Sequence, residues 1–282
     1  MLFVNFGNPE LRNVPSAYRV DIKLTLGPDY DAQRLIELSA EAVEGLVREA
    51  RAHQAQLDTL PIGGPEEPAL AVTLAAMLQG FFGASKSICF PRRNPSAPGE
   101  RYYDLDDPVW PDERASEGVR LRENLRGTMP DSSRLPLPPK QYNLAFLCFA
   151  GAEVESHGRQ ALRVDVPIAI PPRSEPGSPG DEPYGWGVFT VATPFDHRDD
   201  VLKTFAAREV IVGLPEHAGL ALTIAATWEH FYYDERPLFG WLAGPPGQRG
   251  YDLTMVIDLA EARQRGETLR HHLAGEQVFW SE

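Results

Sequence analysis

The sequence predicts an α/β protein made of two tandem Rossmann-like domains with mostly parallel sheets, related by internal duplication. Three observations lead to this prediction. Apolar runs of strand length alternate with runs of helix length along the chain. The length of 282 residues is that of about two domains. A stretch of fourteen residues occurs twice, as ALAVTLAAMLQGFF at 69–82 and as GLALTIAATWEHFY at 219–232, with six positions identical.

Shorter pieces repeat in the same order around this stretch. Residues 2–7 parallel 144–149, residues 19–26 parallel 163–170, and residues 103–105 parallel 251–253. Both copies of the long stretch follow a Leu-Pro pair, at 60–61 and 214–215. Measured from that pair, the loop before the helix is four residues longer in the first copy. The repeats predict a pseudo-dimer within one chain.

The domain boundaries follow from composition. We expect a first domain at 1–110 and a second at 143–282. Residues 111–142 are rich in Pro and charge, which is typical of a linker, with room for a short helix at 116–125.

In the first domain, residues 18–26 alternate between apolar and polar, which predicts a half-exposed strand. Residues 31–52 carry one apolar stripe, and Asp29 or Asp31 can cap this helix. The helix at 69–82 is apolar nearly all round, which is typical of a buried helix, and Pro68 suits its first turn. Further strands are expected at 2–6, 57–62, 86–90 and 101–105.

The second domain is expected to repeat this order with insertions. Residues 171–184 read as a Pro-, Gly- and Ser-rich loop, and 187–193 as an added strand. Residues 209–213 are dense in β-branched side chains and predict a strand before the second copy of the buried helix. The remaining strands are expected at 237–242 and 251–258, and the remaining helices at 196–205 and 259–273.

Composition narrows the functional classes. The formal net charge of −13 argues against a long nucleic-acid surface, which needs Lys and Arg to displace counterions. No apolar run reaches the length of a membrane span, and the first residues do not resemble a signal peptide. Cys89 and Cys148 lie in apolar runs, so we expect buried, reduced thiols and a cytoplasmic protein.

Familiar enzyme signatures are missing from the sequence. It contains no GxGxxG after a strand, no GxxxxGK[ST] and no GxSxG. None of the seven histidines pairs with Cys or Asp at metal-ligand spacing. We therefore expect neither a metal site nor a cofactor.

The candidate ligand site follows from the fold class, because ligands of open α/β sheets bind at the carboxyl ends of the strands. Loops at those ends lead into the N-termini of both repeated helices, where free N–H groups suit a phosphate. His217 lies in the second such loop and is the candidate base. The ordinary alternative is a set of short βα turns. The candidate ligand-binding residues are Asn5, Gly7, Asn8, Gly63, Gly64, Arg92, Arg93, Gly151, Glu216 and Gly219.

The order of these features resembles the CARF-type, Rossmann-like accessory proteins of type III CRISPR systems. The resemblance rests on the Asn-Phe-Gly-Asn-Pro turn at 5–9, the two Leu-Pro pairs followed by Ala-rich helices, and the closing strand at 251–259. It implies binding of a cyclic oligoadenylate between the two units, with sequestration or metal-independent cleavage of the ring in antiviral signalling. It also implies a monomer with pseudo-two-fold symmetry or a homodimer.

For cleavage, a 2′-hydroxyl of the ligand could attack its own phosphate, with His217 as base. Two other readings remain open. One is a non-catalytic structural or interaction protein on a duplicated scaffold. The other is an enzyme that modifies a nucleotide or a sugar phosphate, which should show convergent carboxylates in one deep pocket.

Overall fold

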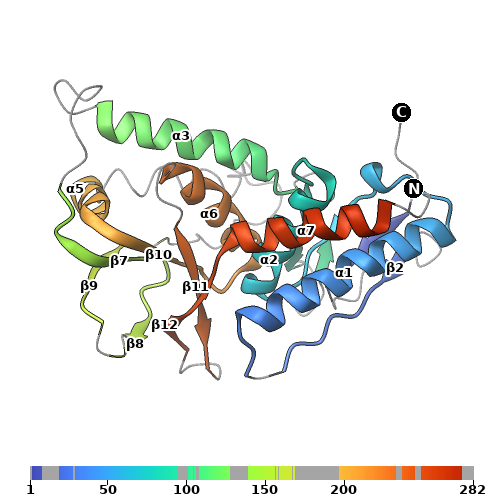
Figure 1. Ribbon diagram of the computed structural model, residues 1–282, viewed down its shortest axis with the longest axis horizontal. Helices are drawn as coiled ribbons and strands as arrows, with labels where there is room; N and C mark the ends of the chain where they lie inside the picture. The colour runs from blue at the N-terminus through green and yellow to red at the C-terminus, as the bar shows by residue number, and fades with distance from the viewer. Residues whose placement is uncertain are drawn as a thin grey trace. The chain divides into compact units, whose positions relative to one another are not determined.

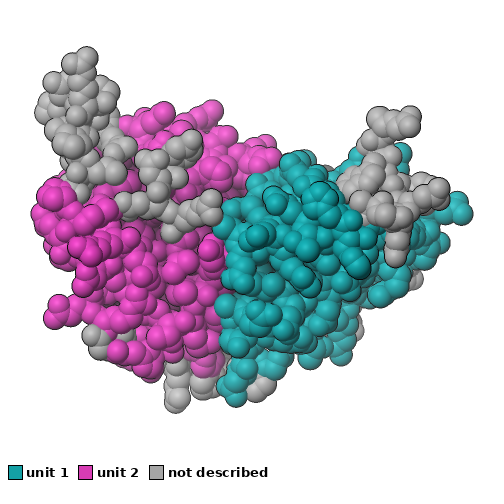
Figure 2. Space-filling model, viewed as in Figure 1, with its two compact units in different colours: residues 1–110, 217–222, 259–282 teal, residues 111–216, 223–258 magenta. Residues whose placement is uncertain are grey.

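A computed structural model describes residues 2–7, 19–27, 29–93, 101–103, 105, 108–127, 139–155, 157, 159–166, 168, 197–232, 237–244 and 249–274. The chain forms two compact units, coloured separately in Figure 2. Unit 1 comprises residues 1–110, 217–222 and 259–282, and unit 2 comprises residues 111–216 and 223–258. Each unit is therefore built from segments that are separate in sequence, and the helix at 259–274 returns to unit 1 rather than staying with the strands that precede it.

The sheet of unit 1 has four parallel strands in the order β2-β1-β3-β4. These are β1 (Phe3–Asn5), β2 (Arg19–Asp21), β3 (Ile62–Gly63) and β4 (Ile88–Cys89). A separate antiparallel pair is formed by β5 (Pro91–Arg93) and β6 (Arg101–Tyr103). The helices are α1 (Ala32–Ala52), α2 (Pro68–Phe82) and α7 (Leu259–Ala274), with a 3-10 turn at Leu57–Thr59 (Figure 1).

The sheet of unit 2 has six strands in the order β8-β12-β11-β10-β7-β9. The strands are β7 (Tyr142–Cys148), β8 (Glu153–Glu155), β9 (Ala161–Asp165), β10 (Ala207–Gly213), β11 (Leu238–Ala243) and β12 (Gly250–Ile257). Only the β11–β12 pairing is antiparallel. The helices are α3 (Pro111–Gly127), α5 (Arg198–Lys203) and α6 (Ala218–Phe231), of which residues 218–222 are counted with unit 1, and a 3-10 turn lies at Thr204–Ala206. The fold-class prediction of two Rossmann-like units with mostly parallel sheets is confirmed.

The four strands β9-β7-β10-β11 repeat the order β2-β1-β3-β4. The register sharpens the correspondence, because Asn5 lies opposite Asp21 and Gly63, as Cys148 lies opposite Asp165 and Gly213. Residues 3–5 therefore match 146–148, one position away from the sequence-based pairing. In the sequence alone, an apolar run of small and large residues can be aligned in either of the two registers. In a sheet, a slip of one residue would turn every side chain to the other face, so the strand pairing decides between the two alignments.

The Leu-Pro comparison was also wrong. β3 ends at Gly63 with α2 beginning at Pro68, and β10 ends at Gly213 with α6 beginning at Ala218. The pair that matches residues 214–215 is thus 64–65, and the two entry loops have equal length.

Most predicted elements are present with shifted ends. α1 begins where Asp31 caps it, since Asp31 Oδ1 accepts from the Arg34 N–H at 2.8 Å. Pro68 occupies the first turn of α2, as expected. The predicted strand at 18–26 forms a strand only at Arg19–Asp21, and the first half of the predicted strand at 57–62 is the 3-10 turn. The expected linker helix is longer than 116–125, and the loop at 171–184 and strand at 187–193 lie outside the described residues.

In each unit the buried repeated helix is covered by a helix that packs through glycine. In unit 1, α2 lies beside α7 (Figure 1), where a Cβ on Gly266 would stand 2.1 Å from the Met77 carbonyl oxygen. In unit 2, a Cβ on Gly118 of α3 would stand 1.9 Å from the Thr227 carbonyl oxygen of α6. Met77 and Thr227 are equivalent positions of the repeat, so both units use the same close contact between helix backbones.

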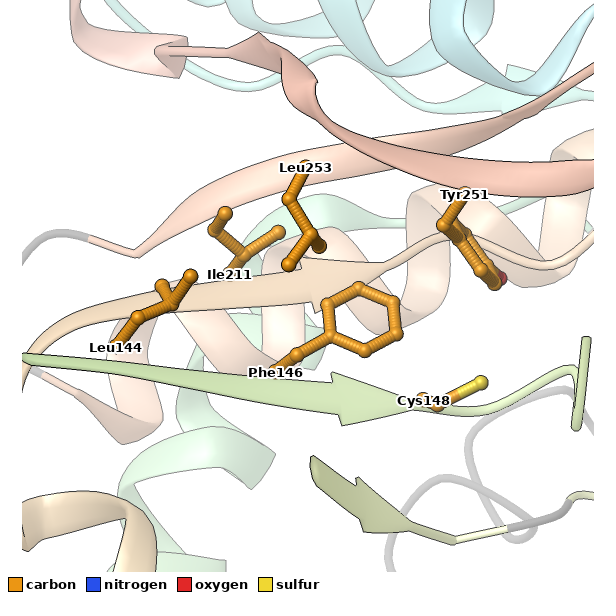
Figure 3. Packing of buried hydrophobic residues seen from close by; sticks show 6 residues of the cluster. All are labelled: Leu144, Phe146, Cys148, Ile211, Tyr251 and Leu253. Atoms are coloured by element: carbon orange, nitrogen blue, oxygen red, sulfur yellow. The ribbon is translucent and has the colours of Figure 1, made fainter. Parts of the chain in front are cut away.

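In unit 2 two aromatic rings meet across the sheet. Tyr251 of β12 packs against Phe146 of β7 with ring centroids 5.0 Å apart, although β10 and β11 separate the two strands, and both rings lie over Gly213 of β10. Together with Ile211 and Leu253 these rings belong to one buried cluster (Figure 3). In unit 1, Tyr103 packs on Phe3 in the same way, at 5.2 Å. Both cysteines are buried and free, as expected, and none of the described helices has the length and apolar content needed to cross a membrane.

Candidate functional site

The strand order defines one candidate site in each unit. The connections from β1 and β3 leave these neighbouring strands in opposite directions, and β7 and β10 do the same in unit 2. Ligands of open α/β sheets bind in the crevice at such a switch point, at the carboxyl ends of the strands. In unit 1 the backbone brings Asn5, Gly7, Gly63 and Gly64 to this point, and the Phe6 N–H donates to the Gly63 carbonyl at 2.9 Å.

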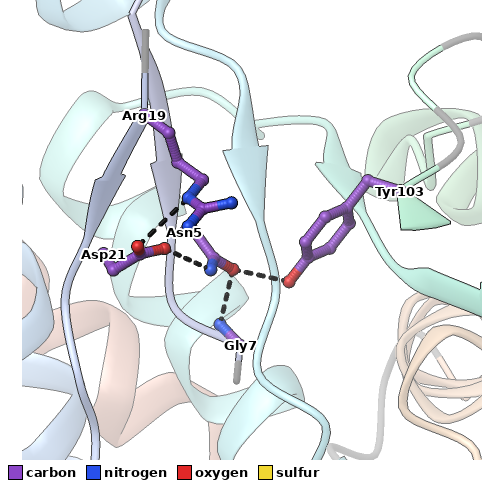
Figure 4. A network of polar contacts seen from close by, with 5 residues as sticks. All are labelled: Asn5, Gly7, Arg19, Asp21 and Tyr103. Atoms are coloured by element: carbon purple, nitrogen blue, oxygen red, sulfur yellow. Dashed lines mark hydrogen bonds and ion pairs between the residues drawn. The ribbon is translucent and has the colours of Figure 1, made fainter. Parts of the chain in front are cut away.

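A network of polar side chains occupies the switch point of unit 1 (Figure 4). The buried Asn5 amide nitrogen donates to Asp21 Oδ1 at 2.6 Å, and its oxygen accepts from Tyr103 Oη at 2.7 Å and from the Gly7 N–H at 3.0 Å. Arg19 Nε donates to Asp21 Oδ2 at 3.1 Å. The side-chain oxygen of Asn5 thus accepts two hydrogen bonds from the protein. Its amide nitrogen holds the Asp21 carboxylate, which in turn orients Arg19.

The switch point of unit 2 repeats this set with one replacement. Cys148 takes the place of Asn5, at the end of the strand beside Asp165. Arg163 donates to both Asp165 oxygens at 2.8–3.0 Å, and its Nη2 also donates to the Ala152 carbonyl at 2.9 Å. Tyr251 Oη donates to the Leu214 carbonyl at 2.7 Å, just as Tyr103 Oη reaches the equivalent Gly64 carbonyl at 3.3 Å.

Burial shapes the protonation of the central groups. Burial raises the pKa of both phenols, and neighbouring carboxylates add to this, Glu66 near Tyr103 and Glu216 near Tyr251. Burial also raises the pKa of the Cys148 thiol, while the backbone N–H groups of Ala150, Gly151 and Ala152 act in the opposite direction. The phenols and the thiol are therefore neutral near pH 7, and the thiol is a weak acceptor facing three amides.

The two helix entries differ in charge. Before α2, the Glu67 carboxylate caps the helix by accepting from the Ala69 N–H at 3.4 Å, and Tyr30 Oη donates to the same oxygen at 2.7 Å. His217 is the equivalent residue before α6, half-buried, with its carbonyl accepting from the Ala221 N–H at 2.8 Å. A carboxylate of the protein already occupies the favourable anion position of α2.

Glu216, a candidate ligand residue, is exposed and lies 3.5 Å from Arg249 Nη1. The pair partly neutralises the entry to α6.

Packing accounts for three of the predicted glycines. A Cβ on Gly63 would collide with the rings of Phe3 and Tyr103 at 2.8 Å. The ring of Phe90 stands 2.6 Å from a Cβ on Gly64 and 3.2 Å from one on Gly219. Gly151 differs, because its φ is +65° and no atom lies within 4 Å of its Cβ position. The ligand roles proposed for these glycines remain predictions, and Gly151 alone among these four faces open space.

The remaining predicted residues are less defined. Asn8 lies outside the described residues, and for Arg92 and Arg93 only the backbone of β5 is described. Sequence reasoning missed the roles of Arg19, Asp21, Arg163 and Asp165. The signal was present, since Arg-Val-Asp occurs in both copies and a period-2 strand places Arg and Asp on the same face.

Comparison with known proteins adds little to this picture. No model of a protein family matches the chain, and no curated protein matches it. Among solved structures, the chain is similar to a Cap4 receptor from Acinetobacter baumannii that contains a SAVED/CARF domain, in complex with the cyclic trinucleotide 3′3′3′-cAAA. The TM-score is 0.36 at 8% sequence identity, over 89% of this chain and 50% of that protein, so the chain matches half the length of the receptor.

Proposed function

We propose that this chain binds a cyclic oligonucleotide, with cyclic oligoadenylates as the first candidates, at the carboxyl ends of the parallel strands in its two sheets. The observation that carries the proposal is the repetition of one side-chain set at both switch points. Each has an Arg-Asp pair on the strand beside the central one, and a buried tyrosine tied to the loop before the long buried helix. A ligand built from repeated nucleotides matches a protein that offers the same contacts twice.

The chemistry of the set suits a compact anion rather than a long polymer. Arg19 and Arg163 can each donate to phosphate or to a base edge, and Asp21 and Asp165 can accept from ribose hydroxyls or exocyclic amines. A few oriented donors suffice for a small ring, whereas a long nucleic acid would need many cations, which a chain of net charge −13 does not favour.

The finer form of the proposal concerns what happens to the ligand. Sequestration requires only binding. Cleavage would use His217 at the entry of α6 as the base that accepts the proton of an attacking 2′-hydroxyl, with no metal. Either outcome would place the protein in the control of antiviral signalling by cyclic nucleotides.

Thermal melting with cyclic tri-, tetra- and hexa-adenylate tests the proposal. A ligand present at 100 times its dissociation constant should stabilise the fold by about 2.7 kcal/mol, a rise in Tm of roughly 5 °C for a chain of this size. Incubation of the ring that binds, followed by chromatography, separates a binder from a nuclease, with His217→Ala as the control for cleavage. If no ring shifts Tm, the proposal is wrong and the non-catalytic scaffold becomes the favoured interpretation.

A further inference from the structure

In the described part of the chain, the group on which the backbone amides of the loop after β7 act is a thiol. The N–H groups of Ala150, Gly151 and Ala152 act on the Cys148 sulfur, which stays neutral because it is buried. A neutral thiol is among the weakest acceptors in proteins. Three successive amides around a left-handed residue are the arrangement that forms anion-binding concavities, and Gly151 supplies that conformation with a φ of +65°.

A cation stands beside these amides and is held in place. Arg163 lies on β9 opposite Phe146 of β7, and its Nη2 fixes the loop through the Ala152 carbonyl at 2.9 Å. Asp165 orients the guanidinium from the other side through two oxygens. The side chain of Arg163 remains 39% exposed, so a ligand in solvent can reach it.

The loop itself is accessible. Ala150 and Gly151 are exposed, and no atom lies within 4 Å of the Cβ position of Gly151. Packing therefore does not explain this glycine, unlike the three glycines that face aromatic rings. Its left-handed φ is what favours glycine at this position, and the space beside it is open.

We propose that residues 150–152, together with Arg163, form a binding site for a phosphate or phosphodiester group in unit 2. The inference rests on the proposed function in that the phosphate would belong to the cyclic oligonucleotide. Amides and the guanidinium donate to the phosphate oxygens, and Asp165 acts as a positioning residue that keeps Arg163 aimed at them.

In unit 1, the one described amide that corresponds to this set is already used by the protein. The Asn5 oxygen, a strong acceptor, takes the N–H of Gly7, which is the residue equivalent to Ala150. In unit 1 the Asn5 oxygen is therefore the acceptor for this amide, and in unit 2 we assign that acceptor role to an external anion. A ligand phosphate should accordingly prefer unit 2.

The test compares two arginines of unit 2 in the full chain. Arg163→Gln removes the proposed phosphate contact. Arg159→Gln is the matched control, because Arg159 is 38% exposed and likewise pairs with a carboxylate (Glu209) and a backbone carbonyl (Leu253). Isothermal titration with the ring that raises Tm should show about tenfold or greater weakening in Arg163→Gln and less than about twofold in Arg159→Gln. Melting without ligand checks that both variants are folded.

A second measurement separates this inference from the proposed function. The amide resonances of residues 150–152 are followed by NMR while inorganic pyrophosphate is added to the wild-type chain and to Arg163→Gln. Saturable shifts in the wild type that are lost in the variant support the site, whether or not any cyclic ring binds. If a ring binds equally to both arginine variants, or if pyrophosphate leaves these amides unmoved, the site assignment is overturned while the proposed function stands or falls on the melting experiment.

Discussion

The switch points of the two units share one backbone arrangement and differ in what fills it. In unit 1, the Asn5 oxygen accepts from the Gly7 N–H of the first loop, and the Glu67 carboxylate accepts from the Ala69 N–H at the entry of α2. In the second repeat, Cys148 of unit 2 stands in place of Asn5, and His217 stands in place of Glu67 at the entry of α6. The charged groups near these positions also differ. In unit 1 they are Arg19, Asp21, Glu66 and Glu67. In unit 2 they are Arg163, Asp165, Glu216 and Arg249. The formal charges of the groups named in unit 1 sum to a negative value, whereas the formal charges of those named in unit 2 cancel.

The comparison teaches that repeating a fold does not repeat a site. The strands and the tyrosine anchors are alike in both units, while the side chains at two equivalent positions differ. We expect the loop amides of unit 2 to contact phosphate, whereas in unit 1 the Asn5 oxygen already accepts from the corresponding amide of Gly7.

The largest expected loss of stability comes from changes at the helix–helix contact that both units share. Gly118→Ala in unit 2 and Gly266→Ala in unit 1 each place a Cβ about 2 Å from a backbone carbonyl oxygen of the helix beneath. Alanine is favoured over glycine in a helix by about 1 kcal/mol, but a clash with backbone forces the helices apart and should remove roughly 3 kcal/mol or more. Urea unfolding measures the loss. Gly27→Ala is the control, since nothing lies within 4 Å of its Cβ position, and an equal loss there would refute the packing argument.

The tyrosine anchors should differ between units. Tyr103→Phe removes the donor to Asn5 Oδ1 and the Gly64 carbonyl, whereas Tyr251→Phe removes the donor to the Leu214 carbonyl alone. An unmet buried acceptor costs about 1–3 kcal/mol. Asn5 Oδ1 keeps the Gly7 N–H when the single Tyr103 hydroxyl proton is removed, whereas the Leu214 carbonyl loses a contact of 2.7 Å, so the loss of unfolding free energy should be larger for Tyr251→Phe. An equal or larger loss in Tyr103→Phe would show that the Asn5 network depends on the phenol more than on the Gly7 amide.

Glu67 offers a way to sharpen the contrast in charge. Glu67→Gln keeps an acceptor for the Ala69 N–H and removes the charge, so stability should fall by only about 0.5–1 kcal/mol. If an anionic ligand also approaches unit 1, its affinity should rise several-fold, as seen by titration. Unchanged affinity would indicate that the charged groups of the ligand contact unit 2 and not unit 1. Weaker binding would contradict the role of Glu67 as an internal anion.

The smallest effect concerns a carboxylate found in β12 of unit 2. Partial burial acts to raise the pKa of Asp252, but hydrogen bonds from Thr254 and His157 outweigh it and lower this pKa. A depressed pKa stabilises the fold above the unfolded value of about 3.9, and the contribution is lost as pH falls through the folded value. Asp252→Asn should therefore reduce stability by a few tenths of a kcal/mol at pH 7 and by less near pH 3. A loss that grows toward low pH would contradict the sign.

Much of the fold could be predicted because its signals are local. The cap Asp31, the first-turn Pro68 and the apolar repeat at 69–82 specify helices through short-range physics, and the repeat itself predicted two similar units. The strand at 18–26 was overestimated because alternation alone does not show how far a neighbouring strand extends. The same limit applied to residues 57–62.

Parts of the site could also be predicted. The rule for strand ends brought Asn5, Gly7, Gly63 and Gly64 together correctly. It could not show that Gly63 and Gly64 make room for aromatic rings, because Phe90 and Tyr103 are distant in sequence. Nor could it show that Arg163 reaches the carbonyl of Ala152.

The sequence by itself determined the fold class, the two buried helices and the strand-end loops, since hydrophobic periodicity and capping act over a few residues. Tertiary structure alone decided the register that equates Asn5 with Cys148, the return of α7 to unit 1, and the burial that raises the pKa of the Cys148 thiol. These depend on which distant segments share a core, and on burial, which sets the charge of a side chain only after the chain has folded.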